Sequence, residues 1–151
     1  MTRLDAIAAL LKSQSTMALA TVGEDGAARV TPLYYLADEE LRLYWFSSAA
    51  SAHSKSLLKN PAVAVAVYRP SEGWREIRGV QMRGVAAVVA DRARRRTVAE
   101  AYAERFHLGR ALRAGMARSR LYGFEPEWVR YIDNSRGFGR GFEAPVARLL
   151  R

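Results

Sequence analysis

Residues 17–36 carry the sequence MALATVGEDGAARVTPLYYL, which decides the first part of the fold. The segments 17–22 and 27–36 predict two strands. The residues between them, GEDG at 23–26, predict a tight turn because glycine reaches positive φ without steric cost. The whole segment therefore predicts an antiparallel hairpin.

A third strand, a short helix and a fourth strand are expected next. Residues 41–47 (LRLYWFS) combine aromatic and apolar side chains, which predicts a strand. Ser51 can cap a short helix, and Asn60-Pro61 ends it because proline disfavours helix in the preceding residue. Residues 62–68 (AVAVAVY) are apolar at every position. This pattern predicts a strand covered on both faces, as in a barrel wall that also faces a partner.

The second half of the chain predicts further strands around one long helix. Residues 75–90 predict a long strand or a bent pair of strands, with Gly79 and Gly84 as bend points. The other expected elements are helices at 3–13, at 92–107 and in a short piece ending near 116, and strands at 118–124 and 128–132. Sequential hairpins with few helices favour a mainly β (α+β) antiparallel barrel over a parallel doubly wound sheet.

Composition restricts the class of protein. A chain of 151 residues predicts one domain, which we place at 1–140 with a C-terminal tail at 141–151. The absence of cysteine excludes disulfides, thiolate metal sites and cysteine nucleophiles. The two histidines, His53 and His107, are far apart in sequence, which argues against a histidine zinc site. No apolar run reaches a membrane span of about 20 residues, and the N-terminus does not match a signal peptide. We therefore expect a cytoplasmic protein.

The net charge of +9 comes mostly from arginine and predicts attraction to anions of every kind. The densest basic run, at 92–96, is more typical of a solvated helix face than of a nucleic-acid site, because no docking motif accompanies it. The glycine-rich segment at 137–141 is not followed by a long helix and so fails the context of a dinucleotide fingerprint. Neither histidine has a convincing serine and acid partner for a hydrolase triad.

Several strings, taken in order, resemble the pyridoxamine 5'-phosphate oxidase-like split barrel over nearly the whole chain. These are the hairpin at 17–36, LRLYWFSS at 41–48, SAHSKSLLKNPAVAVAV at 51–67, IRGVQMRGVA at 77–86 and YIDNSRGFGR at 131–140. The last two look most like the YhbP-like branch of the family. The resemblance implies an antiparallel split β-barrel with a few flanking helices, and a homodimer with two FMN sites at the subunit interface.

The resemblance also implies where the FMN phosphate would lie, at the start of the short helix. The residues implied are Ser47, Ser48, Ser51, His53, Ser54 and Lys55. Elementary physics supports this region, because a helix N-terminus presents free N–H groups and a positive dipole end to an anion. The chain departs from the oxidase itself, which has an Arg-Lys pair where this sequence has Ala52-His53. The alternative interpretation is an ordinary capped surface helix.

The flavin ring is implied to lie against three further parts of the chain. The residues are Arg29, Pro32, Leu33 and Tyr34 on the second strand, Gln81 from the other subunit, and Trp128, Asn134 and Arg136 near the C-terminus. An amide can pair with the polar edge of the ring, and an arginine can bind an anionic substrate. The alternatives are a solvent-facing Arg29, an edge strand without a ligand, a solvent-facing Gln81, and a C-terminal segment that packs across the dimer.

The function expected is that of an FMN-dependent oxidoreductase with an unspecified small-molecule substrate or electron donor. Flavin carries the redox chemistry itself, so no catalytic side chain is required for hydride transfer. The alternatives are a flavin-binding or sensor protein without turnover, and a protein that binds deazaflavin or haem. Haem would need an axial ligand, for which His53 and His107 are the available imidazoles. A basic nucleic-acid binder is the remaining alternative and predicts steep salt dependence.

Overall fold

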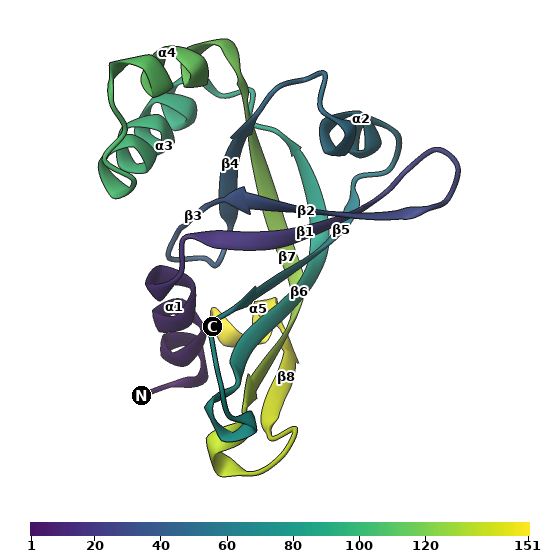
Figure 1. Cartoon of the computed structure of the whole chain (residues 1–151), viewed down its shortest axis with the longest axis vertical. Coiled ribbons are helices and arrows are strands. Elements are labelled where there is room, and N and C mark those ends of the chain that lie inside the picture. The colour runs from purple at the N-terminus through teal and green to yellow at the C-terminus, as the bar shows by residue number, and fades with distance from the viewer.

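The computed structural model describes all residues from 1 to 151 and contains one curled antiparallel sheet (Figure 1). The sheet has the order β2-β1-β5-β6-β7-β4-β3, and β8 pairs with β7 beside this path. The strands are β1 Thr16–Val22, β2 Ala28–Tyr34, β3 Leu36–Ala37, β4 Leu43–Ser47, β5 Ala62–Tyr68, β6 Arg78–Val88, β7 Arg120–Asp133 and β8 Gly141–Pro145. The predicted mainly β split barrel is confirmed.

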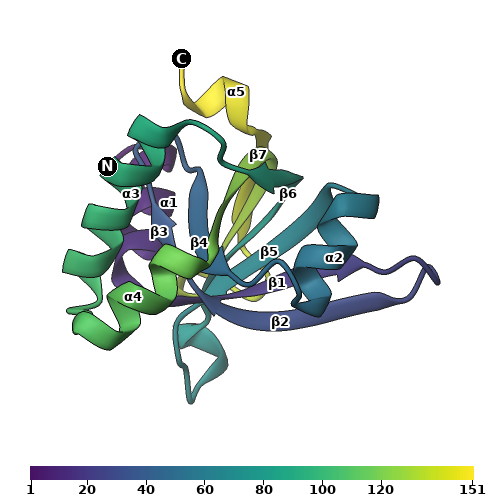
Figure 2. The same ribbon diagram turned by 90° about the horizontal axis from the view of Figure 1, so that it is seen from above.

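Helices cover the sheet in separate groups. They are α1 Arg3–Ser13, α2 Ala52–Lys59, α3 Arg92–Arg105, α4 Arg110–Arg118 and α5 Val146–Leu149, with short 3-10 turns η1 Trp74–Glu76 and η2 Asn134–Arg136. The pair α3 and α4 lies at one corner of the molecule, whereas α2 lies at another corner beside the β1–β2 hairpin (Figures 1 and 2). None of these helices has the length and apolar character needed to cross a bilayer.

The core lies on the concave side of the sheet, and β5 shows how it is divided from the outer side. Its valines Val63, Val65 and Val67 are buried, whereas the alternating Ala62 and Ala64 are exposed and Ala66 is partly exposed. Within the single chain only the valine face is covered, so the expected cover of the other face by a partner stays a prediction. Both sets of side chains are apolar, so the polarity of the residues does not show the period-two alternation that separates the two faces.

Other strands differ from expectation for local reasons. The expected strand at 27–36 is interrupted at Tyr35, whose buried hydroxyl donates to the backbone oxygen of Leu11 in α1. The two strands expected at 118–124 and 128–132 form one strand, β7, because a bulge absorbs the irregularity between them. Residues 141–149 of the expected tail form β8 and α5, and Val146 belongs to the core.

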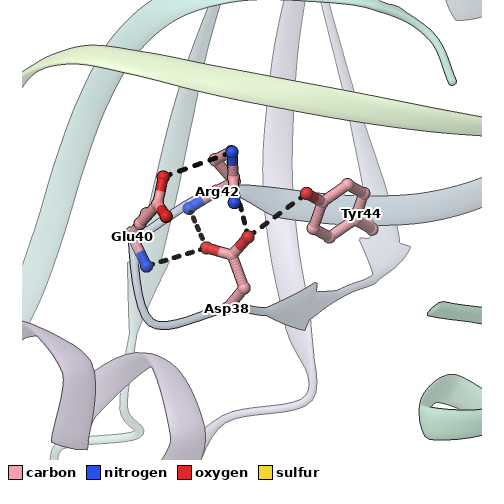
Figure 3. A network of polar contacts seen from close by, with 4 residues as sticks. All are labelled: Asp38, Glu40, Arg42 and Tyr44. Atoms are coloured by element: carbon pink, nitrogen blue, oxygen red, sulfur yellow. Dashed lines mark hydrogen bonds and ion pairs between the residues drawn. The ribbon is translucent and has the colours of Figure 1, made fainter. Parts of the chain in front are cut away.

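One carboxylate holds the turn between β3 and β4 (Figure 3). Asp38 accepts hydrogen bonds from the backbone N–H groups of Glu40 and Arg42, from Arg42 Nε at 2.7 Å and from Tyr44 Oη at 3.2 Å. Within this turn Leu41 has a φ of 64° and yet is fully buried. The Asp38 contacts thus stabilise a left-handed backbone conformation at Leu41, which residues other than glycine rarely adopt. In this conformation the side chain of Leu41 packs in the core.

The pairing of β6 with β7 requires a glycine at position 84. The register shifts between Arg83 and Gly84, where β7 carries an extra residue. A Cβ on Gly84 would lie 2.0 Å from the carbonyl oxygen of Glu125 and 3.0 Å from Pro126 Cα. Gly79, the other expected bend point, lies in regular pairing opposite Tyr68 and Ile132. Only Gly84 marks a bulge.

We predict that Gly84→Ala destabilises the protein by about 3 kcal/mol, because a backbone atom must move to make room for the methyl group. The matched control is Gly115→Ala in α4, where an added Cβ meets no atom within 4 Å. That change should stabilise the protein by about 0.5–1 kcal/mol, since alanine is the better helix former. Urea unfolding followed by circular dichroism measures both, and equal effects of the two substitutions would contradict the argument.

Candidate functional site

A cluster of hydroxyl groups and one imidazole surrounds the start of α2. Ser51 is the N-cap residue, and its Oγ accepts from the backbone N–H of Ser54 and lies 2.7 Å from Ser54 Oγ. His53 Nε2 lies 2.8 Å from Ser47 Oγ and 3.2 Å from Ser51 Oγ. Ser48 Oγ accepts from the backbone N–H of Ala50 and so shapes the loop that leads into the helix. Thus the end of β4 and the first turn of α2 are joined through His53.

Burial lowers the pKa of His53 below its ordinary value. Its ring is therefore neutral at pH 7, and an anion placed beside it would favour the protonated form. Ser47 and Ser54 are buried, so they hold the ring and the cap rather than face solvent. Ser48 is exposed, and the half-buried His53 lines an open hollow.

A hollow of about 420 Å³ opens between the first turn of α2 and the β1–β2 hairpin. It is lined by Thr21, Arg29, Val30, Thr31, Ala52 and His53. Arg29 pairs across the hairpin with Thr21, and Thr31 is two residues farther along β2, so these three side chains project from the concave face. The hollow therefore combines a guanidinium, an imidazole, two threonine hydroxyls and a helix N-terminus.

A second hollow of about 460 Å³ adjoins the first, because Arg29 and Ala52 line both. We call the two together the α2 groove. Asp25 lies 3.9 Å from the guanidinium of Arg29, and Glu24 pairs with Lys59 at 3.2 Å. These pairs leave the exposed Lys55 as the cation of the second hollow without a carboxylate partner. Because the side chain of Ala52 is small, the helix N-terminus is accessible from both hollows.

The structure brings together part of the predicted site and leaves the rest apart within one chain. Pro32, Tyr34, Gln81 and Trp128 lie on the outer face of the sheet. Register connects Pro32 through Ala18 and Ala66 to Gln81 in one cross-strand row. Leu33 points to the opposite face and packs against the core. Pro32, Tyr34, Gln81 and Trp128 do not line the α2 groove.

The C-terminal residues of the predicted site lie at the far end of the β6–β7–β8 region from α2 (Figure 1). Asn134 is buried, and its amide donates to the backbone oxygen of Trp74 at 2.9 Å and accepts from the N–H of Gly139 at 3.0 Å. This amide holds η1 against the turn after η2. Arg136 is exposed and lines another hollow, of about 510 Å³, with Arg3 and Arg140.

Sequence reasoning missed three features of these surfaces. Thr21 and Thr31 line the α2 groove, and the signal for them was their position on the same face of the hairpin as Arg29. On the outer face, the guanidinium of Arg83 lies over the ring of Trp128, 5.0 Å from its centroid. The register of β6 with β7 places Arg83 opposite Trp128, and no local sequence pattern predicts this pairing.

Comparison with known proteins agrees with this fold. No curated protein matches the chain. Among solved structures, a conserved hypothetical protein from Mycobacterium tuberculosis is 22% identical, with a TM-score of 0.76 over 88% of this chain and 85% of its own. HutZ, the haem storage protein from Vibrio cholerae, is 20% identical, with a TM-score of 0.70 over 84% of this chain and 92% of its own.

A protein from Clostridium acetobutylicum related to general stress protein 26, of the pyridoxine phosphate oxidase family, is 13% identical, with a TM-score of 0.71 over 99% of both chains. At such identities these likenesses speak for the fold. The sequence profile of pyridoxamine 5'-phosphate oxidase matches residues 4–133, which is most of the chain. The chain therefore belongs to the pyridoxamine 5'-phosphate oxidase-like family of split barrels.

Proposed function

We propose that this protein binds FMN, with the flavin phosphate in the α2 groove. The observation that carries the proposal is the convergence of Arg29 and His53 on one hollow at the N-terminus of α2. A helix N-terminus attracts phosphate through its free N–H groups and its dipole. Arginine adds paired donors that match the geometry of a phosphate. Arg29 would thus supply from β2 the guanidinium that the helix start lacks at Ala52.

The proposed activity is that of an oxidoreductase acting on a small-molecule substrate or electron donor. Bound flavin would supply the chemistry of hydride or single-electron transfer. The residues of this chain would then anchor and orient the flavin. Lys55 and Arg29 would attract its phosphate by charge. His53 would form a hydrogen bond with it, while contacts with Ser47 and Ser51 fix the orientation of the imidazole ring. The same groove serves a flavin-binding sensor without turnover, and steady-state oxidation of a reductant separates the two.

The proposal extends to a homodimer that buries the outer face of β5. Ala64 and Ala66 form a flat strip on this face, and the exposed Tyr68 and Val85 border it. Small side chains allow two sheets to approach closely, and an exposed apolar strip of this kind marks an interface. Gln81 lies opposite Ala66 on that face, where it could reach a flavin held by the partner.

Haem is the second candidate ligand, because one structural relative is a haem storage protein. An axial ligand needs a free imidazole nitrogen. His53 Nε2 already contacts two serine hydroxyls, and His107 lies exposed in the turn between α3 and α4. The polar surroundings of His53 favour a phosphate over an iron porphyrin, and deazaflavin would use the same groove.

Arg29→Gln and Lys55→Gln should each weaken FMN binding by about tenfold, since each removes a charge-assisted hydrogen bond to phosphate. The affinity is measured from quenching of flavin fluorescence. Lys12→Gln is the matched control: Lys12 lies on α1, away from the groove, and pairs with Glu39, so the affinity should stay unchanged. If the protein binds haemin tightly, with a Soret band, and does not quench FMN fluorescence, the proposed ligand is haem and not FMN.

The affinity for FMN should rise about three- to tenfold as the pH falls from about 8 to about 6. Burial lowers the pKa of His53 in the free protein, whereas a bound phosphate favours the imidazolium, so binding takes up a proton. Titrations at a series of pH values, with His53→Gln in parallel, measure this effect. The substitution should flatten the profile, and identical slopes for both proteins would exclude His53 from the phosphate site.

Ala66→Arg should convert the protein to a monomer, because a charged side chain on the apolar strip cannot be buried without a partner. Size-exclusion chromatography with light scattering gives the mass. The control is Leu112→Glu, which places a charge at an exposed apolar position of α4 away from the sheet. A dimer that persists in Ala66→Arg, or a wild-type monomer, would rule out this face as the interface.

A further inference from the structure

A groove of about 410 Å³ is lined by residues of α3 and α4. These two helices lie at a different corner of the molecule from α2 (Figure 2). The floor of the groove is apolar and is made by Phe46, Ala99, Ala103, Met116 and Ala117. The volume lies within the range of small-molecule sites, about 300–1,000 Å³, and such sites combine apolar side chains with a few polar groups, as this lining does. We call it the α3–α4 groove.

The rim of the α3–α4 groove is strongly basic. Arg92, Arg95, Arg96 and Arg113 line it, and Glu100 is the one acidic residue among the lining side chains. Ion pairs elsewhere in the chain use other basic residues, so no carboxylate lies within 4 Å of these four guanidinium groups. Arg92 and Arg96 lie one turn apart on α3 and so project on the same side.

One of these arginines is fixed in place by the protein itself. The guanidinium of Arg95 donates to the backbone oxygens of Met116 at 3.1 Å and Ser119 at 3.0 Å, which are the carbonyls at the end of α4. It also lies over the ring of Phe46, 5.3 Å from the centroid. Arg95 thereby holds the two helices at their spacing and keeps the groove open beside an ordered positive charge.

We propose that the α3–α4 groove is a second binding site, separate from the α2 groove, for a phosphate monoester with a slender apolar substituent. The phosphate would lie between Arg92, Arg96 and Arg113, and the substituent would lie on the floor formed by Ala99 and Met116. A phosphate monoester carries nearly two negative charges at pH 7, which suits guanidinium groups that have no carboxylate partner better than a carboxylate does. Arg113 is also held in place, since its Nε donates to the backbone oxygen of Leu108 at 3.2 Å.

The shape of the site argues for a small molecule rather than a nucleic acid. Nucleic-acid backbones bind to basic surfaces by their phosphates alone, without need of an apolar floor. Here the arginines border a concave slot whose base is alanine and methionine. Small alanines leave depth between the helices for an alkyl chain, which gains about 0.8 kcal/mol for each CH₂ removed from water.

The test is isothermal titration of the whole protein with octyl phosphate as the probe, at constant ionic strength. We expect one saturable site whose affinity falls at least about tenfold in Arg92→Gln/Arg96→Gln, because two charge-assisted contacts are lost. The matched control, Arg110→Gln/Arg118→Gln on α4, makes the same change of net charge outside the groove. Its affinity for octyl phosphate should equal that of the wild type.

A second variant tests the apolar half of the site. Ala99→Leu fills the floor, so it should weaken octyl phosphate severalfold while leaving the much weaker binding of inorganic phosphate unchanged. Octanoate should bind more weakly than octyl phosphate by about tenfold, since it carries a single charge. Circular dichroism and the thermal midpoint, recorded for each variant, separate a loss of binding from a loss of folded protein.

Four outcomes would overturn the proposal. They are the absence of saturable binding, equal losses in the groove variant and the control, inorganic phosphate binding as tightly as octyl phosphate, and a loss of octyl phosphate affinity in Arg29→Gln as large as in the groove variant, which would place the probe in the α2 groove. Displacement by a short duplex DNA at far lower concentration would identify the surface as a nucleic-acid site instead.

Discussion

The long antiparallel pairing of β6 with β7 is the constraint on which the rest of the structure depends. It joins the half of the sheet that carries β1, β2 and β5 to the half that carries β4 and β3. The bulge opposite Gly84 adds one residue to β7 and bends both strands. A bend at this point lets one sheet curl around a single core, with Trp45 and Phe124 at its centre.

The curl also explains why polar groups gather where they do. The concave side of the sheet is filled with apolar side chains except near the end of β4, where Ser47, Thr21 and Ser54 are buried. The Ser47 hydroxyl contacts His53 and the Ser54 hydroxyl contacts Ser51, because buried polar groups need hydrogen-bond partners. The resulting edge of the core is the one place where an imidazole, a strand-borne guanidinium and a helix N-terminus meet.

The excess of positive charge is distributed over distinct surfaces rather than spread evenly. Arg29 and Lys55 belong to the α2 groove, Arg92 and Arg96 to the α3–α4 groove, and Arg3, Arg136 and Arg140 to the hollow near the N-terminus. Each surface combines its cations with a different floor: hydroxyls in the first, alanine and methionine in the second. Net charge alone could not make this distinction, because it does not say which charges share a surface.

Local sequence determined the elements and the class of fold. Turn glycines, the cap at Ser51 and the stop at Asn60-Pro61 act within a few residues, so the sequence was sufficient to predict their effects. The family and the start of α2 as a candidate phosphate site followed from the same local strings. Tertiary structure alone decided which face of β5 is buried, that 141–149 joins the sheet, and that Asn134 holds a turn. It also decided that Arg29 meets His53 while Gln81 and Trp128 lie on the opposite face. Such facts depend on register and on contacts between distant segments, and a shift of one residue in pairing would reverse every one of those faces.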